Sequence, residues 1–257
     1  MTYNPQRDKV KNCVVIVPYN QQIVPPCDDA LRELERRGYV VRRIPGFAAI
    51  DQARNILATE ALRDGFEETM WIDSDTGFHP DVVDQLRQHQ LPLVGGICAQ
   101  KGKRALACHQ LETTTEIRFG RIGGLQELFY LGTGFMHVRK QVYETLQTQL
   151  RLPTCNAQFG RPTIPFFMPM VRETERGPWY LAEDYAFCQR VRECGFRIMA
   201  DTTVRLRHYG AYGYCWEDAG LPRTQFESFT FHFAPPSTTT STAVENAISN
   251  PSPAISC

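Results

Sequence analysis

The segment MWIDSDTGF, residues 70–78, is an apolar run that ends in two aspartates one residue apart. The unbroken apolar run, which begins with TMWID at 69–73, is typical of a strand buried inside a sheet. Two carboxylates at the end of such a strand repel each other and lose hydration. The segment therefore predicts a buried strand whose end brings both aspartates to a place where something offsets their charge.

Buried strands and amphipathic helices alternate on either side of this segment. Apolar, β-branched runs predict further strands at 13–19, 39–46 and 91–99. Helical periodicity and terminal proline or glycine signals predict helices over about 25–37, 51–65 and 79–90. The order β-α-β-α-β-α-β predicts an α/β fold with a doubly wound, mostly parallel sheet, whose strand ends line a ligand crevice.

After residue 101 the alternation is less regular. Three segments predict strands (116–120, 128–138 and 197–209), helices are expected near 139–149 and 183–194, and a proline-rich loop covers 162–170. We expect these elements to extend the same domain, which spans residues 1–233. Residues 234–257 are rich in Ser, Thr and Pro without apolar periodicity, which predicts a disordered tail.

Composition excludes some function classes. Lysines plus arginines and aspartates plus glutamates number 28 each, so no overall positive field attracts a nucleic acid or an anionic membrane. The nine cysteines form no C-x-x-C pair, which favours buried thiols in a reducing compartment over a zinc site or a disulfide framework. The polar N-terminus lacks a signal core and no stretch is long enough to span a bilayer, so we expect a cytoplasmic protein without a transmembrane segment.

The spacing of Asp73 and Asp75 sets a geometric requirement. Side chains one residue apart on a strand point to opposite faces, so both aspartates reach one ion only if the chain turns. Gly77 permits such a turn, and a divalent cation would offset the repulsion. An ordinary strand-end turn with a capping aspartate is the alternative. A haloacid-dehalogenase motif, D-x-D-x-[TV], is out of register because Thr76 directly follows the second aspartate.

Two later features add candidate groups. Glu183 and Asp184 open the helix predicted near 183–194, where acidic residues either complement the helix dipole or hold a general base. His208 ends the polar-apolar run of 197–209. A histidine in this position is either structural or, together with the two aspartates, a nitrogen ligand for manganese.

Together with PYN at the end of the first strand and GTGFMHVRK at 132–140, these features resemble the GT-A glycosyltransferases, especially family 2. The resemblance covers about residues 12–210, and EDYAFCQRVRECGFRI at 183–198 is its most specific element. It implies a GT-A type, Rossmann-like sheet with an antiparallel acceptor-side extension. It also implies a UDP- or GDP-sugar donor, a Mn²⁺ or Mg²⁺ ion, and transfer to the hydroxyl of an acceptor: a glycan, a small molecule, a protein or a modified nucleic acid.

The resemblance also assigns roles to residues. It makes Asp73, Asp75 and His208 the metal ligands, and Asp184 the base of an inverting reaction with Glu183 beside it. The remaining matches and candidates are expected to contact the donor: Pro18, Tyr19, Asn20, Arg54, Ser74, Lys101 and Gly134. Trp179 either stacks on a sugar or packs as a plug.

Departures from the family narrow the prediction. The chain has neither the membrane helices nor the Q-x-x-R-W motif of processive synthases, which favours a single addition. Inverting and retaining chemistry both remain open because one fold supports both. A sugar nucleotidyltransferase is a second alternative, although VPYNQQIVPP at 17–26 has neither the glycine nor the lysine of its usual loop. A sugar-nucleotide binding protein without catalysis is a third.

Overall fold

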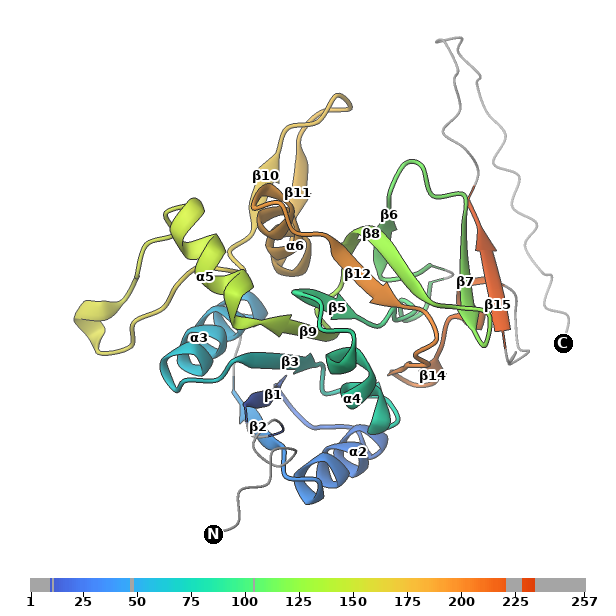
Figure 1. The fold of residues 1–257 in the computed structure, drawn as a ribbon, viewed down its shortest axis with the longest axis horizontal. Coiled ribbons are helices and arrows are strands. Elements are labelled where there is room, and N and C mark those ends of the chain that lie inside the picture. The colour runs from blue at the N-terminus through green and yellow to red at the C-terminus, as the bar shows by residue number, and fades with distance from the viewer. Residues whose placement is uncertain (1–9, 11, 47–48, 104, 221–227, 234–257) are drawn as a thin grey trace, which may run out of the picture.

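The computed structural model describes residues 10, 12–46, 49–103, 105–220 and 228–233, and an eight-stranded sheet forms its centre (Figure 1). The strand order is β2-β1-β3-β9-β5-β12-β8-β6. The strands are β1 (Cys13–Tyr19), β2 (Val40–Pro45), β3 (Glu68–Ile72), β5 (Leu93–Gly95), β6 (Cys108–Gln110), β8 (Leu125–Leu131), β9 (Phe135–Arg139) and β12 (Ile198–Asp201). Only β9 and β8 run against the others. The predicted α/β class with a mostly parallel sheet is confirmed.

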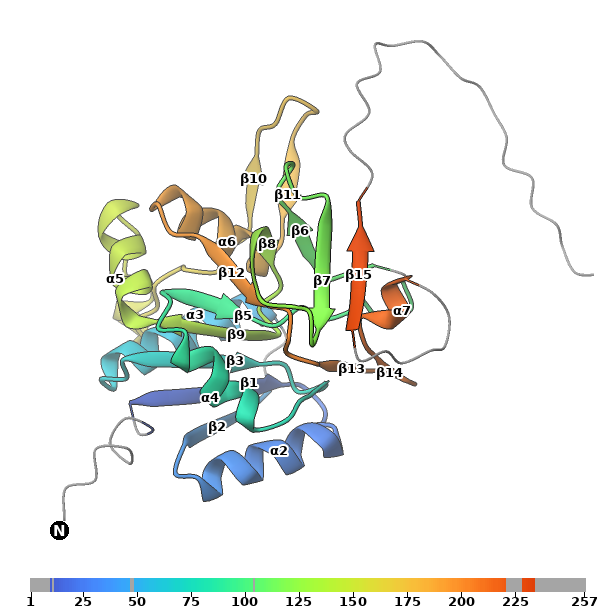
Figure 2. The same cartoon turned by 45° about the vertical axis from the view of Figure 1, so that its right-hand side comes forward.

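Helices cover both faces of this sheet. They are α2 (Pro25–Arg36), α3 (Ile50–Arg63), α4 (Asp81–Gln88), α5 (Lys140–Gln149) and α6 (Glu183–Glu193). Residues alternate along β1, so Val14 and Ile16 join the apolar cluster under α3, α5 and α6, whereas Val15 and Val17 join the cluster under α2 and α4. Figures 1 and 2 accordingly show α2 and α5 on opposite sides of the sheet. The predicted helices are confirmed, with ends shifted by at most two residues.

Smaller antiparallel sheets and two short helices complete the described fold. The sheets pair β10 (Met170–Arg172) with β11 (Trp179–Leu181), β13 (Arg207–Tyr209) with both β4 (Thr76–Gly77) and β14 (Gly213–Tyr214), and β7 (Glu116–Gly120) with β15 (Ser228–His232). The short helices are a 3₁₀ turn (Ala157–Phe159) and α7 (Glu217–Gly220). Figure 2 shows the β10–β11 hairpin projecting beyond α6. These sheets supply the antiparallel extension expected from the sequence.

Two segments predicted as single strands each form two strands. Residues 128–138 divide into β8 and β9 because the intervening GTG turns the chain, and the Gly134 carbonyl accepts a hydrogen bond from the Asp73 N–H at 2.9 Å. Residues 197–209 divide into β12 and β13 because Asp201 Oδ1 accepts the Thr203 N–H at 2.9 Å and stops the strand. The apolar pattern continues through both turns, so it did not reveal them.

The fourth predicted strand, 91–99, is present as β5 but is shorter than predicted. Its ladder ends at Gly95, and β9 from the second half of the chain lies between it and β3. A Cβ atom on Gly95 would lie 2.5 Å from the Phe135 carbonyl oxygen, so the close passage of β9 requires glycine here. The sheet is therefore mostly parallel, and β9 interrupts it between β3 and β5 as β8 does between β12 and β6.

Two further expectations concern regions outside the core. No helix among the described residues has both the length and the apolar character needed to cross a membrane. The expected tail, 234–257, lies outside the residues that the structure describes.

Candidate functional site

The carboxyl ends of β1 and β3 open at the same edge of the sheet because the two strands are parallel neighbours. Asp73 follows β3 directly. Its N–H donates to the Gly134 carbonyl at 2.9 Å, and its own carbonyl accepts the Thr76 N–H at 3.0 Å. The chain therefore turns within DSD, as the spacing of the aspartates requires, and Asp73 and Asp75 leave the strand in a compact loop.

A buried arginine binds the first of these aspartates. Arg54, on α3, is 2% exposed, and its Nη2 donates to Asp73 Oδ1 at 2.8 Å. Its Nε lies 3.6 Å from Glu183 Oε1 at the start of α6. Burial alone would lower the pKa of Arg54, but the Asp73 and Glu183 carboxylates outweigh it and raise that pKa. One permanent cation thus joins the loop after β3 to the first turn of α6, and its Nε and Nη1 make no hydrogen bond to the described residues.

The second aspartate has different partners. The Lys101 ammonium donates to Asp75 Oδ2, and His208 Nε2 lies 3.4 Å from Asp75 Oδ1. The antiparallel pairing of β4 with β13 places His208 opposite Thr76, and the Tyr209 N–H donates to the Asp75 carbonyl at 2.7 Å. Burial raises the pKa of the Asp75 carboxyl, but the hydrogen bonds from His208 and Lys101 outweigh this and lower it.

The orientation of His208 is suited to binding a cation. Its Nδ1 lies 2.9 Å from the Ala99 carbonyl oxygen, which only accepts, so Nδ1 carries the hydrogen. In the neutral ring the lone pair of Nε2 faces Asp75 Oδ1 at 3.4 Å, so these two acceptors must share either a proton or a metal ion. Burial lowers the pKa of His208, but the hydrogen bonds to Asp75 and to the Ala99 carbonyl outweigh it and raise that pKa, so a proton and a metal ion compete for Nε2. Carboxylate and imidazole donors suit Mn²⁺, and the carbonyl behind Nδ1 fixes the ring as in many metal sites.

Asp73 does not complete this pair in the described structure. Among the described residues, one ligand atom each from Asp73, Asp75 and His208 do not all lie within 4.8 Å of one another. Arg54 instead occupies one Asp73 oxygen. The structure therefore brings two of the three predicted metal ligands, Asp75 and His208, together. The third, Asp73, is hydrogen-bonded to Arg54 instead.

A cleft of about 460 Å³ lies at this edge of the sheet, within the size range of small-molecule sites. Its lining consists of Pro18, Tyr19, Asn20, Ile50, Arg54, Asp73, Ser74, Asp75 and Glu183. All of these except Ile50 were singled out from the sequence. Ile50 lies four residues before Arg54 on α3, so helical periodicity is the signal that places it on the same face.

Asp184 stands beside the cleft on α6 and is not among its lining residues. Its Oδ1 accepts the Tyr185 N–H at 2.7 Å. Burial, followed by the neighbouring Glu183 carboxylate, raises the pKa of Asp184 to about 6. A carboxyl group with a pKa close to neutral can both accept and release a proton near pH 7, which is the property a general base needs.

The glycines of the GTG turn let the chain pass two of these acids. A Cβ atom on Gly134 would lie 2.8 Å from Asp73 Oδ2, and one on Gly132 would lie 3.6 Å from Asp184 Oδ2. Gly134, predicted to approach the donor, thus approaches Asp73. Sequence reasoning missed the Ala99 carbonyl, because a backbone acceptor leaves no signal in residue identity.

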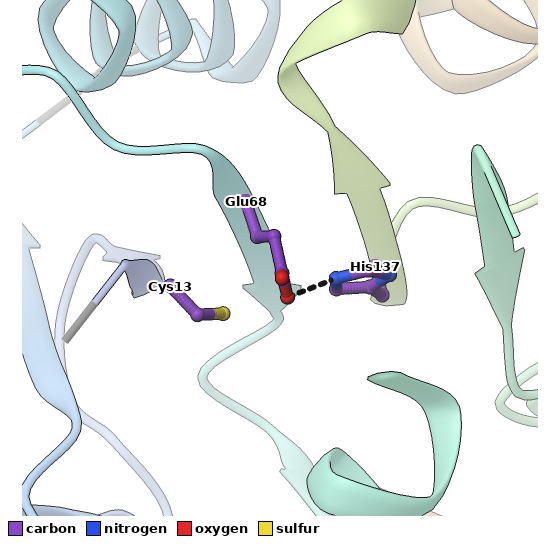
Figure 3. A group of neighbouring side chains, drawn as sticks. All are labelled: Cys13, Glu68 and His137. Carbon is purple, nitrogen blue, oxygen red and sulfur yellow. Dashed lines mark hydrogen bonds and ion pairs between the residues drawn. The ribbon is translucent and has the colours of Figure 1, made fainter. Parts of the chain in front are cut away.

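A second group of candidate ligands lies at the other end of β1 and β3. Cys13, Glu68 and His137 bring one ligand atom each to within 4.8 Å of one another, and Figure 3 shows their side chains converging. Glu68 Oε2 binds His137 Nε2 at 2.9 Å and Arg87 Nε at 2.6 Å. Burial raises the pKa of the Glu68 carboxyl, but these two partners outweigh it and lower the pKa to about 2.

The hydrogen bonds of this second group argue against a metal ion there. His137 Nδ1 is buried and makes no hydrogen bond to the described residues. A metal on Nε2 would transfer the ring hydrogen to Nδ1 and leave a buried donor without an acceptor, which is costly. Arg87 already balances the Glu68 charge. We interpret Glu68, His137 and Arg87 as a buried ion-pair network that stabilises the fold.

Comparisons with known proteins give distant structural likeness. No family model matches the chain, and no curated protein sequence matches it. The crystal structure of A197 from STIV matches over 77% of this chain and 85% of that chain, at 13% identity and a TM-score of 0.49. The crystal structure of GalNAc-T7 with UDP, GalNAc and Mn²⁺ matches over 78% of this chain and 44% of that chain, at 9% identity and a TM-score of 0.42. A glycosyltransferase involved in the glycosylation of the major capsid of PBCV-1 matches over 51% of this chain and 62% of that chain, at 14% identity and a TM-score of 0.30. At these values the likeness assigns neither a family nor an activity.

Proposed function

We propose that this protein is a metal-dependent glycosyltransferase that moves a sugar from a nucleotide-diphosphate sugar to an acceptor hydroxyl. The observation that carries the proposal is the cleft at the carboxyl ends of β1 and β3, which is lined by three carboxylates and a buried arginine, with His208 lying 3.4 Å from one of these carboxylates. Clefts at the carboxyl ends of parallel strands are the usual ligand sites of doubly wound sheets. The GT-A resemblance of the sequence supports the same reaction.

We assign donor binding to the loop after β1 and to Arg54. Pro18, Tyr19 and Asn20 line one part of the cleft and would hold the nucleoside. Arg54 lines the cleft, and its guanidinium charge would attract the diphosphate, which matches the preference of guanidinium groups for phosphate. Because Arg54 is buried and fixed by Asp73, little side-chain entropy is lost when the donor binds.

Asp75 and His208 would hold the divalent cation, with Asp73 as the third ligand. A bound Mn²⁺ or Mg²⁺ would neutralise the charge that develops on the leaving diphosphate. In this arrangement Lys101 must leave Asp75 or share it, because its ammonium occupies the carboxylate now.

We assign Asp184 as the general base that activates the acceptor hydroxyl. Its carboxylate would take the proton of the attacking hydroxyl while the acceptor oxygen bonds to the anomeric carbon and the bond to the diphosphate breaks. This is inverting chemistry, and its check is the anomeric configuration of the product by proton NMR. Glu183 would stay on the donor side, since it lines the cleft and faces Arg54.

Thermal unfolding with Mn²⁺ and a panel of UDP- and GDP-sugars tests donor and metal together. At a ligand concentration a hundredfold above Kd, binding to the folded state adds about 2.7 kcal/mol of stability. We expect one nucleotide sugar to raise the melting temperature of the wild type and not of Asp75→Ala. Asp29→Ala, which removes an exposed aspartate on α2, is the matched control and should respond like the wild type.

The alternatives predict different results in the same experiments. A melting temperature raised by a nucleoside triphosphate and by no nucleotide sugar would favour a nucleotidyltransferase. Binding of a nucleotide sugar without any release of nucleoside diphosphate, to water or to an acceptor, would indicate a binding protein. A product carrying many added sugars would contradict single addition.

The cysteines support a reducing compartment, and we place the protein in the cytoplasm on that basis. The eight cysteines among the described residues are all free, and five of them are buried. Free buried thiols are the usual state in a reducing environment. Fractionation of the native cell, followed by detection of the protein, tests this assignment.

A further inference from the structure

Four aromatic rings gather where β6, β8, β11 and α6 meet. The His109 ring lies 5.0 Å from the Trp179 ring and 5.0 Å from the Tyr185 ring, measured between centroids. Tyr130 lies beneath them, 5.5 Å from Trp179 and stacked 5.3 Å from Tyr185. We call His109, Trp179 and Tyr185, with Tyr130 at the base, the aromatic platform.

The platform is fixed rigidly from below. Tyr130 is fully buried, and its hydroxyl donates to Gln189 Oε1 on α6 at 2.6 Å. The same hydroxyl oxygen lies 3.3 Å from Arg172 Nη1, on the strand opposite Trp179 in the β10–β11 hairpin. Two elements that are distant from Tyr130 in the sequence, α6 and β10, thus hold its ring in place.

The upper part of the platform is open. His109 is exposed and Trp179 and Tyr185 are partly exposed, whereas Trp71 and Trp216 are 0% and 1% exposed. An aromatic side chain that only filled space in the core would be as fully buried as Trp71 and Trp216. Partial burial lowers the pKa of His109, so its ring is neutral at pH 7 and the platform presents no charge of its own.

The platform adjoins the proposed base. Tyr185 is the residue after Asp184, and its N–H donates to Asp184 Oδ1 at 2.7 Å. The other oxygen of Asp184 faces Gly132, two residues after Tyr130 on the chain. The platform therefore lies beside the first turn of α6, which carries Asp184, and apart from the donor cleft, whose lining contains none of the platform residues.

We propose that the aromatic platform is the acceptor subsite and that the acceptor is a neutral carbohydrate, one of whose pyranose rings lies against Trp179 and His109. This inference rests on the proposed function, because it takes Asp184 to be the base. The apolar C–H face of a pyranose suits an aromatic surface, and its hydroxyls suit a site that also has polar edges. Asp184 then lies at the rim of the subsite, where it meets a hydroxyl of the same or the next sugar.

Binding of neutral oligosaccharides tests the subsite without any donor. The probes are cellotetraose, maltotetraose, xylotetraose and chitotetraose, with sorbitol as a polyol that lacks a ring. Of the chain's three tryptophans, Trp71 and Trp216 are buried, so a saturable change in tryptophan emission reports on Trp179. We expect at least one oligosaccharide, and not sorbitol, to produce that change.

Calorimetry on variants then assigns the contact. Trp179→Ala should weaken oligosaccharide binding by about tenfold or more, and Trp179→Phe, which keeps a ring, should restore part of it. The control is Tyr180→Ala, which removes a 67% exposed ring from the opposite face of the same strand and should bind like the wild type. Equal binding by Trp179→Ala and Tyr180→Ala would overturn the proposal, and so would a panel in which no oligosaccharide binds the wild type.

The proposed function can fail separately from this inference. Nucleotide-sugar binding by Trp179→Ala, measured by thermal unfolding, should match the wild type because Trp179 does not line the cleft. A wild type that binds an oligosaccharide through Trp179 but no nucleotide sugar would leave the subsite standing and reject the transferase.

Discussion

Replacing Asp184 with asparagine should make the protein more stable above pH 6 and stop sugar transfer. Folding raises the pKa of this carboxyl from 3.8 to about 6, chiefly through burial. A raised pKa means that the folded state holds the proton more tightly than the unfolded state, so ionisation weakens the fold. The penalty develops from about pH 4 to pH 6 and is complete above it. Two pKa units correspond to about 3 kcal/mol, which is an upper bound for the gain.

Urea unfolding at pH 4 and pH 8 measures this gain. We expect Asp184→Asn to raise the free energy of unfolding by about 1–3 kcal/mol at pH 8 and to change it little at pH 4. The asparagine oxygen can still accept the Tyr185 N–H, so the helix start is preserved. An asparagine variant that is less stable than the wild type at pH 8 would refute the reasoning.

Asp201→Asn is the control of opposite sign. Burial raises the pKa of the Asp201 carboxyl, but hydrogen bonds from Thr203, His89 and Gln85 outweigh this and lower it. Its ionised form therefore stabilises the fold, fully above the unfolded pKa, and this contribution is lost as the pH falls. We expect the substitution to lower the free energy of unfolding at pH 8 by about 1–3 kcal/mol.

Four further predictions concern Asp184, the cations of the candidate site and the network around His137. The rate of sugar transfer should rise with pH and level off above about pH 6, as Asp184 loses its proton, and a flat profile from pH 5 to 8 would exclude it as the base. Arg54→Lys should weaken nucleoside diphosphate binding by about tenfold in calorimetry, because an ammonium group cannot donate in two fixed directions to diphosphate while holding the carboxylates. Lys101→Met should increase Mn²⁺ affinity without nucleotide, since it removes a cation that competes for Asp75; unchanged affinity would contradict that competition. Any effect of excess Zn²⁺ or of a chelator on the melting temperature should be the same in His137→Ala as in the wild type, because the network around His137 needs no metal, and a large Zn²⁺ stabilisation that is lost in His137→Ala would reverse this interpretation.

Local patterns were sufficient for the predicted elements and insufficient for their pairing. Strands β1 and β3 and the helices were predictable because burial leaves a periodic trace in the residues of each element. The insertion of β9 between β3 and β5 was not, since an antiparallel partner from residues 135–139 leaves no periodic mark on either neighbour. The two turns within 128–138 and 197–209 were missed for a related reason. The first turn is fixed by a contact to Asp73, and the second combines the local bond from Thr203 to Asp201 with contacts of Thr202 to Gly120 and Gly124, so distant parts of the chain contribute to both.

In the candidate site, too, the residues could be predicted from local patterns and their contacts could not. Each acidic residue was identifiable because a carboxylate at the end of an apolar strand or at a helix start is unusual and chemically useful. His208 was placed with the aspartates from the sequence, but its pairing with Asp75 alone and the binding of Arg54 to Asp73 were not identifiable, because they depend on the pairing of β13 with β4 and on the packing of α3.

The partners also explain how one short loop carries two carboxylates after a buried strand. Asp73 is balanced by Arg54, and Asp75 by Lys101 and His208, so each charge has its own counter-charge before any ligand binds. The two sets of partners differ in what they allow. Arg54 is buried and always charged, so it keeps Asp73 and Glu183 in place throughout a reaction. Lys101 is long and partly exposed, and His208 is neutral once it loses one proton, so Asp75 can exchange these cations for a metal ion. The fixed pair therefore suits a structural role and the exchangeable pair suits ligand binding, which is why we place the metal on the second aspartate of DSD.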